Sequence, residues 1–289
     1  MNAIRLGQTR QARSRWATTS EYGLLRTGAV DTVDYRLERL PAADDLSELI
    51  ERHWLVRWDL PSGHRRRITL LPHPCVNLVF DRGRLTVAGV GRERFTYEYT
   101  GRGYVFGVKF RPGAFRPFVG GSVKALTDRT IPLSVWWGES ETERMARDLA
   151  QATSFPAMVE VAERYLRAHW PPPDPDVSLI GWIVHALLYD RSVTRVDQVA
   201  ERFGLSTRSL QRLFERYVGV SPKWVLKRYR LHEAAARLAQ GGSGTWADVA
   251  AELGYFDQSH FIRDFTRAVG LTPVEYARAC QRHKAPVSA

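Results

Sequence analysis

The sequence predicts a two-domain α+β protein: a small antiparallel β domain, barrel-shaped or cupin-like, followed by an all-α domain. Three observations lead to this prediction. Short β-branched and aromatic runs fill the first half, apolar residues recur at helical spacing in the second half, and one helical pattern occurs there twice. The length of 289 residues is sufficient for two domains.

Residues 1–30 show no hydrophobic period. They hold five Arg against one Glu, with many Ser, Thr and Gly residues, so we expect a basic, poorly ordered extension. No apolar segment typical of a secretory signal follows the first arginine, and no apolar run approaches the roughly 20 residues of a membrane span. Only two cysteines occur, Cys75 and Cys280, which favours reduced thiols, a cytoplasmic protein and no membrane partner.

Residues 31–135 have the sequence pattern of a β domain, with short runs of β-branched and aromatic residues. Alternation of aromatic with small or polar residues puts the rings on one face of each strand. We predict strands over 76–80, 84–90, 94–100 and 104–110. The aromatic residues could surround one small-molecule effector or simply fill the core. The candidates for an effector pocket are Trp54, Trp58, Phe80, Tyr97, Tyr99, Tyr104 and Phe106.

Residues 136–176 are predicted to be a helical linker. Apolar residues at three- and four-residue steps indicate two amphipathic helices, which end at "PPPDPD" (171–176), a semi-rigid extended segment. The apolar faces of these helices have two possible packing partners. They could pair subunits in a homodimer or pack on their own β domain; the stripes contain Met145, Leu149, Val161 and Tyr165.

Residues 177–289 contain the doubled pattern. In the first copy, Gly204 can end one helix in a left-handed conformation and Ser206 can cap a second helix from Thr207 to about Tyr217. The apolar face of that helix would be turned toward the core of the domain; it carries Leu210, Leu213, Phe214 and Tyr217. Arg208, Gln211 and Arg212 would then point outward. This is the order of a helix-turn-helix unit, whose second helix enters the DNA major groove.

The second copy repeats these features fifty to fifty-one residues later. Gly254 corresponds to Gly204, and Asp257 takes the cap position of Ser206. Gln258, Ser259 and Arg263 fall on or near the outer face, with His260 close by. Asp264 replaces Leu213, which leaves the second helix a thinner core stripe.

A long helix is predicted to join the two copies. It begins at Pro222 and runs to about Gln240, before "GGSG", and its roughly 18 residues would span about 27 Å. Such a strut can hold two recognition helices near the ~34 Å that separates successive major grooves on one face of DNA. A helical solenoid is the competing interpretation, but solenoids need three or more similar repeats.

Charge agrees with a nucleic-acid partner. Of the net charge of +11, most lies at the two ends of the chain: residues 178–289 hold 16 Lys and Arg against 10 Asp and Glu. A basic helical region beside a nearly neutral one favours a polyanion such as double-stranded DNA. A basic surface that is merely solvated is the simpler alternative.

The stretch "AAELGYFDQSHFIRDFTRAVGLTPVEYAR" closely resembles the C-terminal hallmark of the AraC/XylS family of bacterial transcription regulators. The matching positions are Gly254, Tyr255, Ser259, Phe261, Arg263, Phe265, Gly270, Thr272, Pro273 and Tyr276. The segment from "LPHPCVNLVFD" to "GVKFRPGAFRPFVGG" is similar to an uncharacterised N-terminal domain found on such regulators. This second resemblance is less specific, and the two together cover most of the chain from about residue 34 to 282.

The resemblance implies a cupin-like sensor domain and a tandem helix-turn-helix module. It also implies base contacts from Arg208, Gln211 and Arg212 in one groove, and from Gln258, Ser259 and Arg263 in the next. Arg matches the acceptors of guanine and Gln those of adenine. Contacts with or near phosphate are expected from Ser206, Thr207, Lys223 and His260, which would position the protein without specifying sequence.

The sequence predicts neither an enzyme nor a cofactor or metal site. Nucleophile elbows, phosphate loops and dinucleotide fingerprints are absent. His53, His64, His73 and Cys75 could be considered as a metal site, but "HPC" is tight and no second pair has zinc-ligand spacing. The leading hypothesis is therefore a ligand-responsive DNA-binding regulator, with RNA polymerase as a partner if it activates. The first alternative is a constitutive regulator whose N-terminal domain only dimerises or recruits a partner; a catalytic N-terminal domain is a distant second.

Overall fold

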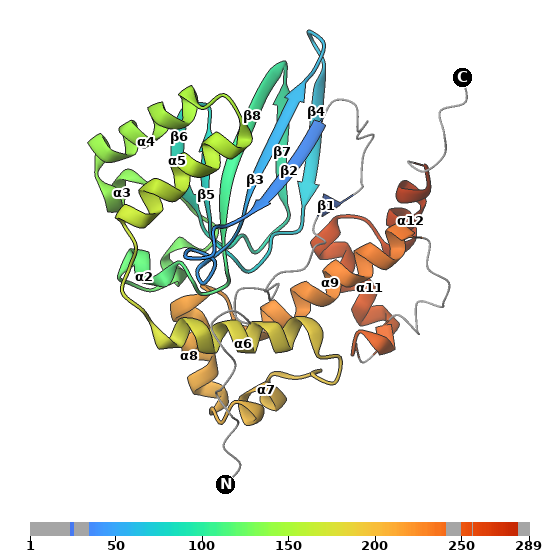
Figure 1. Cartoon of the computed structure of the whole chain (residues 1–289). Helices are drawn as coiled ribbons and strands as arrows, with labels where there is room; N and C mark the ends of the chain where they lie inside the picture. Colours follow the sequence, from blue (N-terminus) through green and yellow to red (C-terminus); the bar gives the residue numbers. More distant parts are fainter. Residues whose placement is uncertain (1–23, 26–34, 241–249, 256, 283–289) are drawn as a thin grey trace.

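The computed structural model describes residues 24–25, 35–240, 250–255 and 257–282. Two antiparallel β-sheets form the upper part of the molecule in Figure 1, and a helical domain lies beneath them. The predicted fold class, an antiparallel β domain followed by an all-α domain, is confirmed. Within the described residues, no helix is both long enough and apolar enough to cross a membrane.

The β domain consists of one large and one small sheet, and every strand pairing is antiparallel. The large sheet has the order β2 (Tyr35–Pro41), β3 (Ile50–Asp59), β8 (Arg102–Phe110), β5 (Asn77–Asp81), β6 (Arg84–Ala88) and β9 (Thr130–Pro132). The small sheet has the order β1 (Leu24–Leu25), β4 (Arg65–Leu70) and β7 (Phe95–Thr100). The four predicted strands correspond to β5, β6, β7 and β8.

Helices cover one face of the large sheet, on the left in Figure 1. They are α4 (Glu139–Gln151) and α5 (Phe155–Ala168), preceded by the short elements α2 (Arg116–Val119), η1 (Val123–Leu126) and α3 (Ser134–Trp137). Met145 and Leu149 are fully buried in the same core as Phe106 and Val108 of β8. The segment predicted as a linker is therefore mostly part of the β domain, because the amphipathic stripes pack on their own sheet.

The helical domain has two cores. The first is built from α6 (Pro175–Tyr189), α7 (Val196–Arg202), α8 (Thr207–Tyr217) and the first half of α9 (Pro222–Gln240). The second contains the other half of α9, residues 250–253, α11 (Gln258–Val269) and α12 (Pro273–Arg282). As predicted, α9 is one continuous helix shared by both units; its predicted "GGSG" terminator lies outside the described residues.

The predicted extended segment 171–176 is shorter than expected. Asp174 caps α6, which already begins at Pro175, by accepting a hydrogen bond from the Asp176 backbone N–H at 3.1 Å. The same carboxylate pairs with Arg116 of the β domain at 3.1 Å and accepts from the Tyr217 hydroxyl of α8 at 2.9 Å. Asp174 therefore links the start of α6 to both the β domain and α8.

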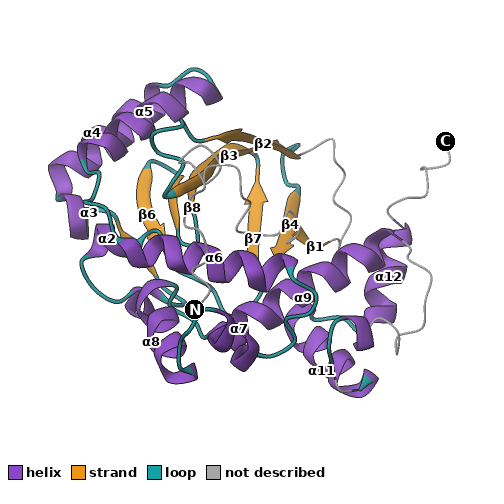
Figure 2. Cartoon of the chain, turned by 60° about the horizontal axis from the view of Figure 1, so that its bottom comes forward, coloured by secondary structure: helices purple, strands orange, loops and turns teal. Residues whose placement is uncertain are grey.

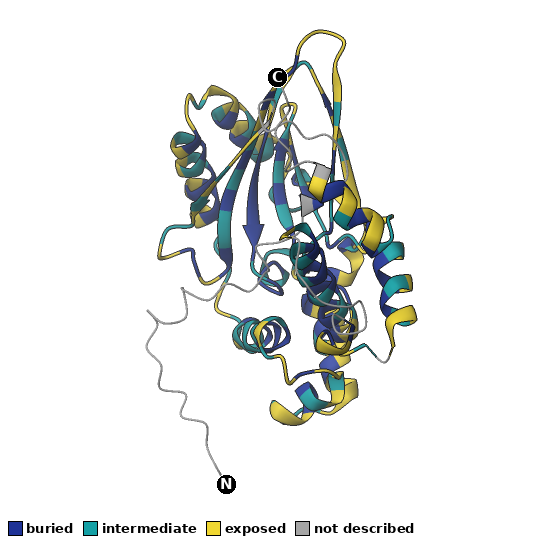
Figure 3. Ribbon diagram, turned by 90° about the vertical axis from the view of Figure 1, so that its right-hand side faces the viewer, coloured by how far each residue is buried: buried dark blue, intermediate teal, exposed yellow. Residues whose placement is uncertain are grey.

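The β domain supplies residues to both helical cores. Leu49, Val90 and Ala114 belong to the first core, whereas Leu25 and Leu71 belong to the second. Figure 2 shows the helices running beneath the ends of the strands, and Figure 3 shows buried residues continuing from strands into the facing helices. Leu24 and Leu25 form strand β1, so this part of residues 1–30 is not an irregular extension; the rest lies outside the described residues.

Candidate nucleic-acid interface

Helix α8 is the second helix of the first helix-turn-helix unit. Gly204 adopts a left-handed φ of +65° just after the end of α7. The Ser206 hydroxyl then caps α8 by accepting a hydrogen bond from the Ser209 backbone N–H at 3.0 Å. Both features agree with the sequence prediction. Leu210, Phe214 and Tyr217 are buried. The opposite face is exposed and carries Arg208, Gln211 and Arg212.

Helix α11 repeats this construction in the second unit. Gly254 adopts φ +69°, and the Asp257 carboxylate caps the helix by accepting from the His260 backbone N–H at 2.7 Å. Phe261, Phe265 and Val269 are buried in the second core. The side chains predicted to point outward, Gln258, Ser259 and Arg263, are exposed, and so is Arg267.

The arginines of these two exposed faces are free to meet a ligand. Within the described part of the chain, Arg208, Arg212 and Arg263 form no ion pair. Surface arginines nearby do: Arg191 pairs with Glu233, and Arg202 pairs with Asp190. Unneutralised guanidinium groups on two equivalent helices provide positive charge and hydrogen-bond donors for an anionic polymer.

The four predicted phosphate neighbours lie near the starts of three helices: Ser206 and Thr207 at α8, Lys223 at α9 and His260 at α11. Thr207 and Lys223 are exposed at the first turns of α8 and α9, so both are accessible. The Ser206 hydroxyl already serves as a helix cap, and it also lies 2.8 Å from the Ser209 hydroxyl. His260 is half-buried, with its Nε2 3.3 Å from Asp264 Oδ2.

Asp264 interrupts the apolar stripe of α11, as its sequence position indicated, yet it is buried and paired. Its Oδ2 lies 2.5 Å from the Lys227 ammonium of α9. The core position is thus occupied by an ion pair between the shared helix and the second recognition helix. A lysine on another element, 37 positions away, cannot be assigned to this partner from helical periodicity.

The predicted effector residues lie on both faces of the large sheet. Trp54, Trp58, Tyr97 and Tyr99 gather in one cluster between the two sheets. Phe80 and Phe106 instead belong to the core beneath α4 and α5, and Tyr104 packs on Phe80 with ring centroids 6.2 Å apart. The structure therefore brings four of the seven together and separates the other three from them by the sheet.

Two glycines of β8 make room for the tryptophans between the sheets. A Cβ atom on Gly107 would lie 2.2 Å from the Trp54 ring, and one on Gly103 would lie 2.5 Å from the Trp58 ring. Hydrogen bonds orient both indoles: Trp54 Nε1 donates to Asn77 Oδ1 at 3.3 Å, and Trp58 Nε1 donates to the Thr100 carbonyl at 3.2 Å. The cluster between the sheets is thus aromatic, and hydrogen bonds fix its two indole N–H groups.

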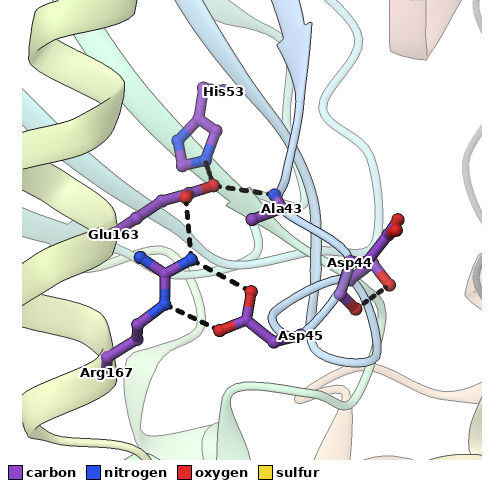
Figure 4. Close-up of polar contacts among 7 residues, drawn as sticks. Ala43, Asp44, Asp45, His53, Glu163 and Arg167 are labelled. Carbon is purple, nitrogen blue, oxygen red and sulfur yellow. Dashed lines mark hydrogen bonds and ion pairs between the residues drawn. The ribbon is translucent and has the colours of Figure 1, made fainter.

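A polar network that the sequence did not indicate joins β3 to α5, with His53 and Glu163 buried and Arg167 and Asp45 at the surface (Figure 4). The Glu163 carboxylate lies 3.1 Å from His53 Nε2 and accepts from the Ala43 backbone N–H at 2.8 Å and from Arg167 at 3.2 Å. Arg167 also forks onto Asp45 at 2.7 and 3.0 Å. Burial lowers the pKa of His53, and the neighbouring Glu163 opposes that shift. This network fastens a helix to the sheet.

The histidines and cysteine considered as metal candidates are placed differently. His53 contacts Glu163, whereas the His73 ring packs against His232 at 4.6 Å. Burial raises the pKa of the Cys75 thiol to about 11. Among the residues that the structure describes, no group of three or more His, Cys, Asp or Glu side chains could hold a metal ion.

Comparison with known proteins gives the same division of the chain. Residues 199–279 match the family model of a helix-turn-helix domain, and residues 38–132 match a domain of unknown function (DUF6597). The chain is 36% identical over 77 residues to the HTH-type transcriptional activator RhaS of Escherichia coli, which covers 27% of each protein. It is 38% identical over 72 residues to the activator RhaR of Yersinia pestis, covering 25% of this chain and 24% of that one.

A solved structure of ToxT from Vibrio cholerae aligns with 85% of this chain and 98% of its own, at 9% identity and a TM-score of 0.36. The chain spans about a third or less of the length of the curated relatives it matches, for example 28% of an uncharacterised HTH-type transcriptional regulator of Haemophilus influenzae and 33% of a RhaS of Pectobacterium carotovorum.

Proposed function

We propose that this chain, whose tandem helix-turn-helix region makes it a member of the AraC/XylS family of transcription regulators, binds a specific double-stranded DNA sequence through α8 and α11. One observation carries the proposal. Two equivalent helices, each capped by a side-chain oxygen at the corresponding position, expose arginines that form no ion pair with any described residue, while their apolar faces are buried in separate cores. Those are the requirements of a helix that lies in the major groove.

The chemistry of the exposed residues supports base reading. Arg208, Arg212 and Arg263 carry forked donors that suit guanine O6 and N7, while Gln211 and Gln258 suit adenine N6 and N7. Each good pair contributes about 1–3 kcal/mol of discrimination between bases. Ser259 can contact either a base edge or a phosphate. Thr207 and Lys223, with Ser206 and His260 beside them, would fix the register of the protein along the backbone.

The length of α9 supports simultaneous use of both helices. Its 19 residues span about 28 Å, which suits two recognition helices placed in successive major grooves about 34 Å apart. A single subunit would then cover two adjacent grooves. A homodimer would cover four, and the stripes of α4 and α5 are already used inside the β domain, so another surface would have to form it.

For the input signal, we propose that a small molecule binds between the two sheets against Trp54, Trp58, Tyr97 and Tyr99. Trp54 and Tyr97 are half-buried, and Asn77 and Asp81 supply polar groups on the same side of the large sheet. An apolar or aromatic compound with one or two hydrogen-bonding groups suits this lining. The alternative is a constitutive regulator whose β domain only dimerises or recruits a partner, such as RNA polymerase at an activated promoter.

The DNA-binding proposal is tested by selecting binding sites from a random duplex library with the full-length chain, followed by footprinting. We expect two motifs protected in adjacent major grooves. Arg212→Ala should relax sequence preference in one motif, and Arg263→Ala in the other. Arg164→Ala, on the surface of α5, removes the same charge far from both helices and should change neither motif. Equal loss of affinity on every sequence would refute the assignment of base readers.

The effector proposal is tested by native mass spectrometry of the freshly purified full-length protein. A discrete additional mass that is lost on denaturation, and reduced in a Trp54→Ala variant that removes one half-buried aromatic ring of the cluster, would support a ligand there. The same spectrum reports whether the protein is a monomer or a dimer. If the native protein had the mass of the polypeptide alone, and if a metabolite extract left its footprints unchanged, the constitutive alternative would be favoured.

A further inference from the structure

We infer that Arg228 and His232, one turn apart on α9, are positioning residues that couple the space between the two sheets to both recognition helices. The inference rests on the proposed function of α8 and α11. It concerns the route by which the β domain influences them, and it follows from how the two sheets are connected.

Two chain segments cross from one sheet to the other near the helical domain. Residues 71–76 connect β4 of the small sheet to β5 of the large sheet, and residues 89–94 connect β6 of the large sheet to β7 of the small sheet. Residues 60–64 and Gly101 join the same sheets at the opposite end of the strands. A change in the separation of the sheets at the end near the helical domain is therefore expected to move residues 71–76 and 89–94, because the strands themselves are held by their ladders.

Helix α9 makes a hydrogen bond to a backbone carbonyl in each crossing segment. The His232 Nε2 donates to the Leu71 carbonyl at 3.0 Å, and the Arg228 Nη2 donates to the Arg92 carbonyl at 2.5 Å. Both side chains are buried, at 0% and 4% exposure. Since a carbonyl only accepts, the neutral His232 ring must carry its proton on Nε2.

The surroundings leave these two side chains few alternative partners. The Arg228 guanidinium lies over the Trp224 ring at 4.5 Å, and the His232 ring lies 4.6 Å from that of His73. Within the described residues, Arg228 Nη1 and His232 Nδ1 are buried without a hydrogen-bond partner. A shift of either carbonyl would leave a further buried polar atom unsatisfied, so α9 is expected to follow the crossing segments.

The 89–94 segment is also connected to the ends of both recognition helices. Asp128 accepts hydrogen bonds from the Arg92 backbone N–H and from its Nε, each at 2.6 Å, and the adjacent Thr127 hydroxyl donates to the Gly219 carbonyl just beyond α8 at 2.7 Å. At the end of α11, a Cβ on Gly270 would lie 2.8 Å from the Arg94 guanidinium. The 89–94 segment therefore contacts the end of α11 directly and is linked to the end of α8 through Asp128 and Thr127.

The coupling can be measured without knowing the effector, because energetic coupling between two binding sites is reciprocal. Hydrogen–deuterium exchange of the full-length protein is measured with and without a duplex obtained by the site selection above. We expect slower exchange in α8 and α11 and, in addition, a changed exchange rate in residues 70–76 and 89–95. Protection of α8 and α11 with no change in the crossing segments would overturn the coupling and leave the proposed function intact.

Variants on α9 then separate positioning from general stability. Arg228→Met should abolish the DNA-dependent change in 89–95 while α8 and α11 remain protected, and Arg228→Lys should retain part of it. Arg230→Met is the matched control, because Arg230 donates at 2.9 Å to the Val193 carbonyl inside the helical domain. If Arg230→Met and Arg228→Met had the same effect, the assignment to Arg228 would be wrong.

His232→Leu provides an independent test should Arg228→Met fail to fold, and it should abolish the change in 70–76. If this change persisted in His232→Leu, the role assigned to His232 would be refuted. If no duplex altered the exchange of α8 or α11 in the unmodified protein, the proposed function itself would fail, and the coupling with it.

Discussion

Buried ionisable side chains in this protein join elements that are distant in the sequence. Glu163 of α5 meets His53 of β3, and Asp264 of α11 meets Lys227 of α9. Each would be costly to bury alone, because an isolated charge loses its hydration, and each therefore requires its partner. Such pairs specify how two elements dock more strictly than apolar contacts do.

The ion pair between Lys227 and Asp264 leads to a prediction about stability. Lys227→Met should lower the free energy of unfolding by about 1–3 kcal/mol, because it removes the ion-pair partner of a buried carboxylate. The Lys227 side chain is 36% exposed, which keeps the cost below that of a fully buried pair. Urea denaturation measures the change. The double variant Lys227→Met with Asp264→Leu should recover most of the loss, and a persisting loss would contradict this account.

His232 leads to a prediction about pH. Burial first, and the charge of Arg228 second, lower its pKa from 6.5 to about 3. The unfolded chain therefore binds a proton more readily than the folded chain between these values, so stability is full above pH 6.5 and is lost as pH falls toward 3. The contribution reaches about 1.4 kcal/mol per pH unit within that window.

Urea denaturation at pH 7.5, 6.5 and 5.5 measures this dependence. His232→Gln keeps a hydrogen-bond donor and removes the titration, so its stability should vary less with pH than that of the unmodified protein. Some dependence should remain in the variant, because the pKa of His53 is also lowered by burial. An identical pH dependence in both proteins would show that His232 is not responsible.

At the scale of single elements, glycine placement explains why β8 can lie beneath two tryptophans. Gly103 and Gly107 alternate with Phe106 and Val108, so one face of the strand is bare where the Trp54 and Trp58 rings lie, and the other face is apolar beneath α5. Successive side chains of a strand point to opposite faces, so the alternation in the sequence produces both faces of β8.

Gly107→Ala should destabilise the β domain by about 1–3 kcal/mol, because the new methyl group would overlap the Trp54 ring and force it to move. Urea denaturation followed by tryptophan fluorescence measures both the stability and the ring environment. Gly181→Ala is the matched control: it lies within α6, nothing surrounds its Cβ within 4 Å, and it should stabilise by roughly 0.5–1 kcal/mol. Equal effects of the two changes would refute the packing argument.

At the scale of the whole molecule, the β domain and the two helix-turn-helix units share their cores. Leu71 is 1% exposed among residues of the second unit, and Val90 is equally buried among those of the first. The two units are therefore supported from a common side as well as through α9. We expect them to unfold together with the β domain.

Leu71→Ala should reduce the cooperativity of unfolding between the β domain and the second helix-turn-helix unit. The truncation removes about 2–5 kcal/mol of packing at the boundary between the β domain and the second unit, so thermal unfolding should separate into two transitions. Calorimetry of the full-length protein measures them. Leu60→Ala truncates a leucine buried only in the inter-sheet cluster, so it should lower the midpoint without separating the transitions. A single transition in Leu71→Ala would contradict the shared-core argument.

The local features were predictable from short stretches of sequence. The caps Ser206 and Asp257, the left-handed Gly204 and Gly254, and the bounds of α8 and α9 all follow from signals within a few residues of each position. The outward faces of α8 and α11 follow from helical period alone, and their roles in reading bases stay predictions.

The sequence by itself determined the order of the elements, the doubled helix-turn-helix and the residues on its exposed faces, because each depends on periodicity and capping along one stretch of chain. Only the tertiary structure decided that α4 and α5 cover the sheet, that the seven aromatic candidates divide between its two faces, and that Arg228 and His232 hold the crossing segments. The physical reason is that these contacts join residues up to 161 positions apart, and local patterns carry no information about which distant partner completes a buried face.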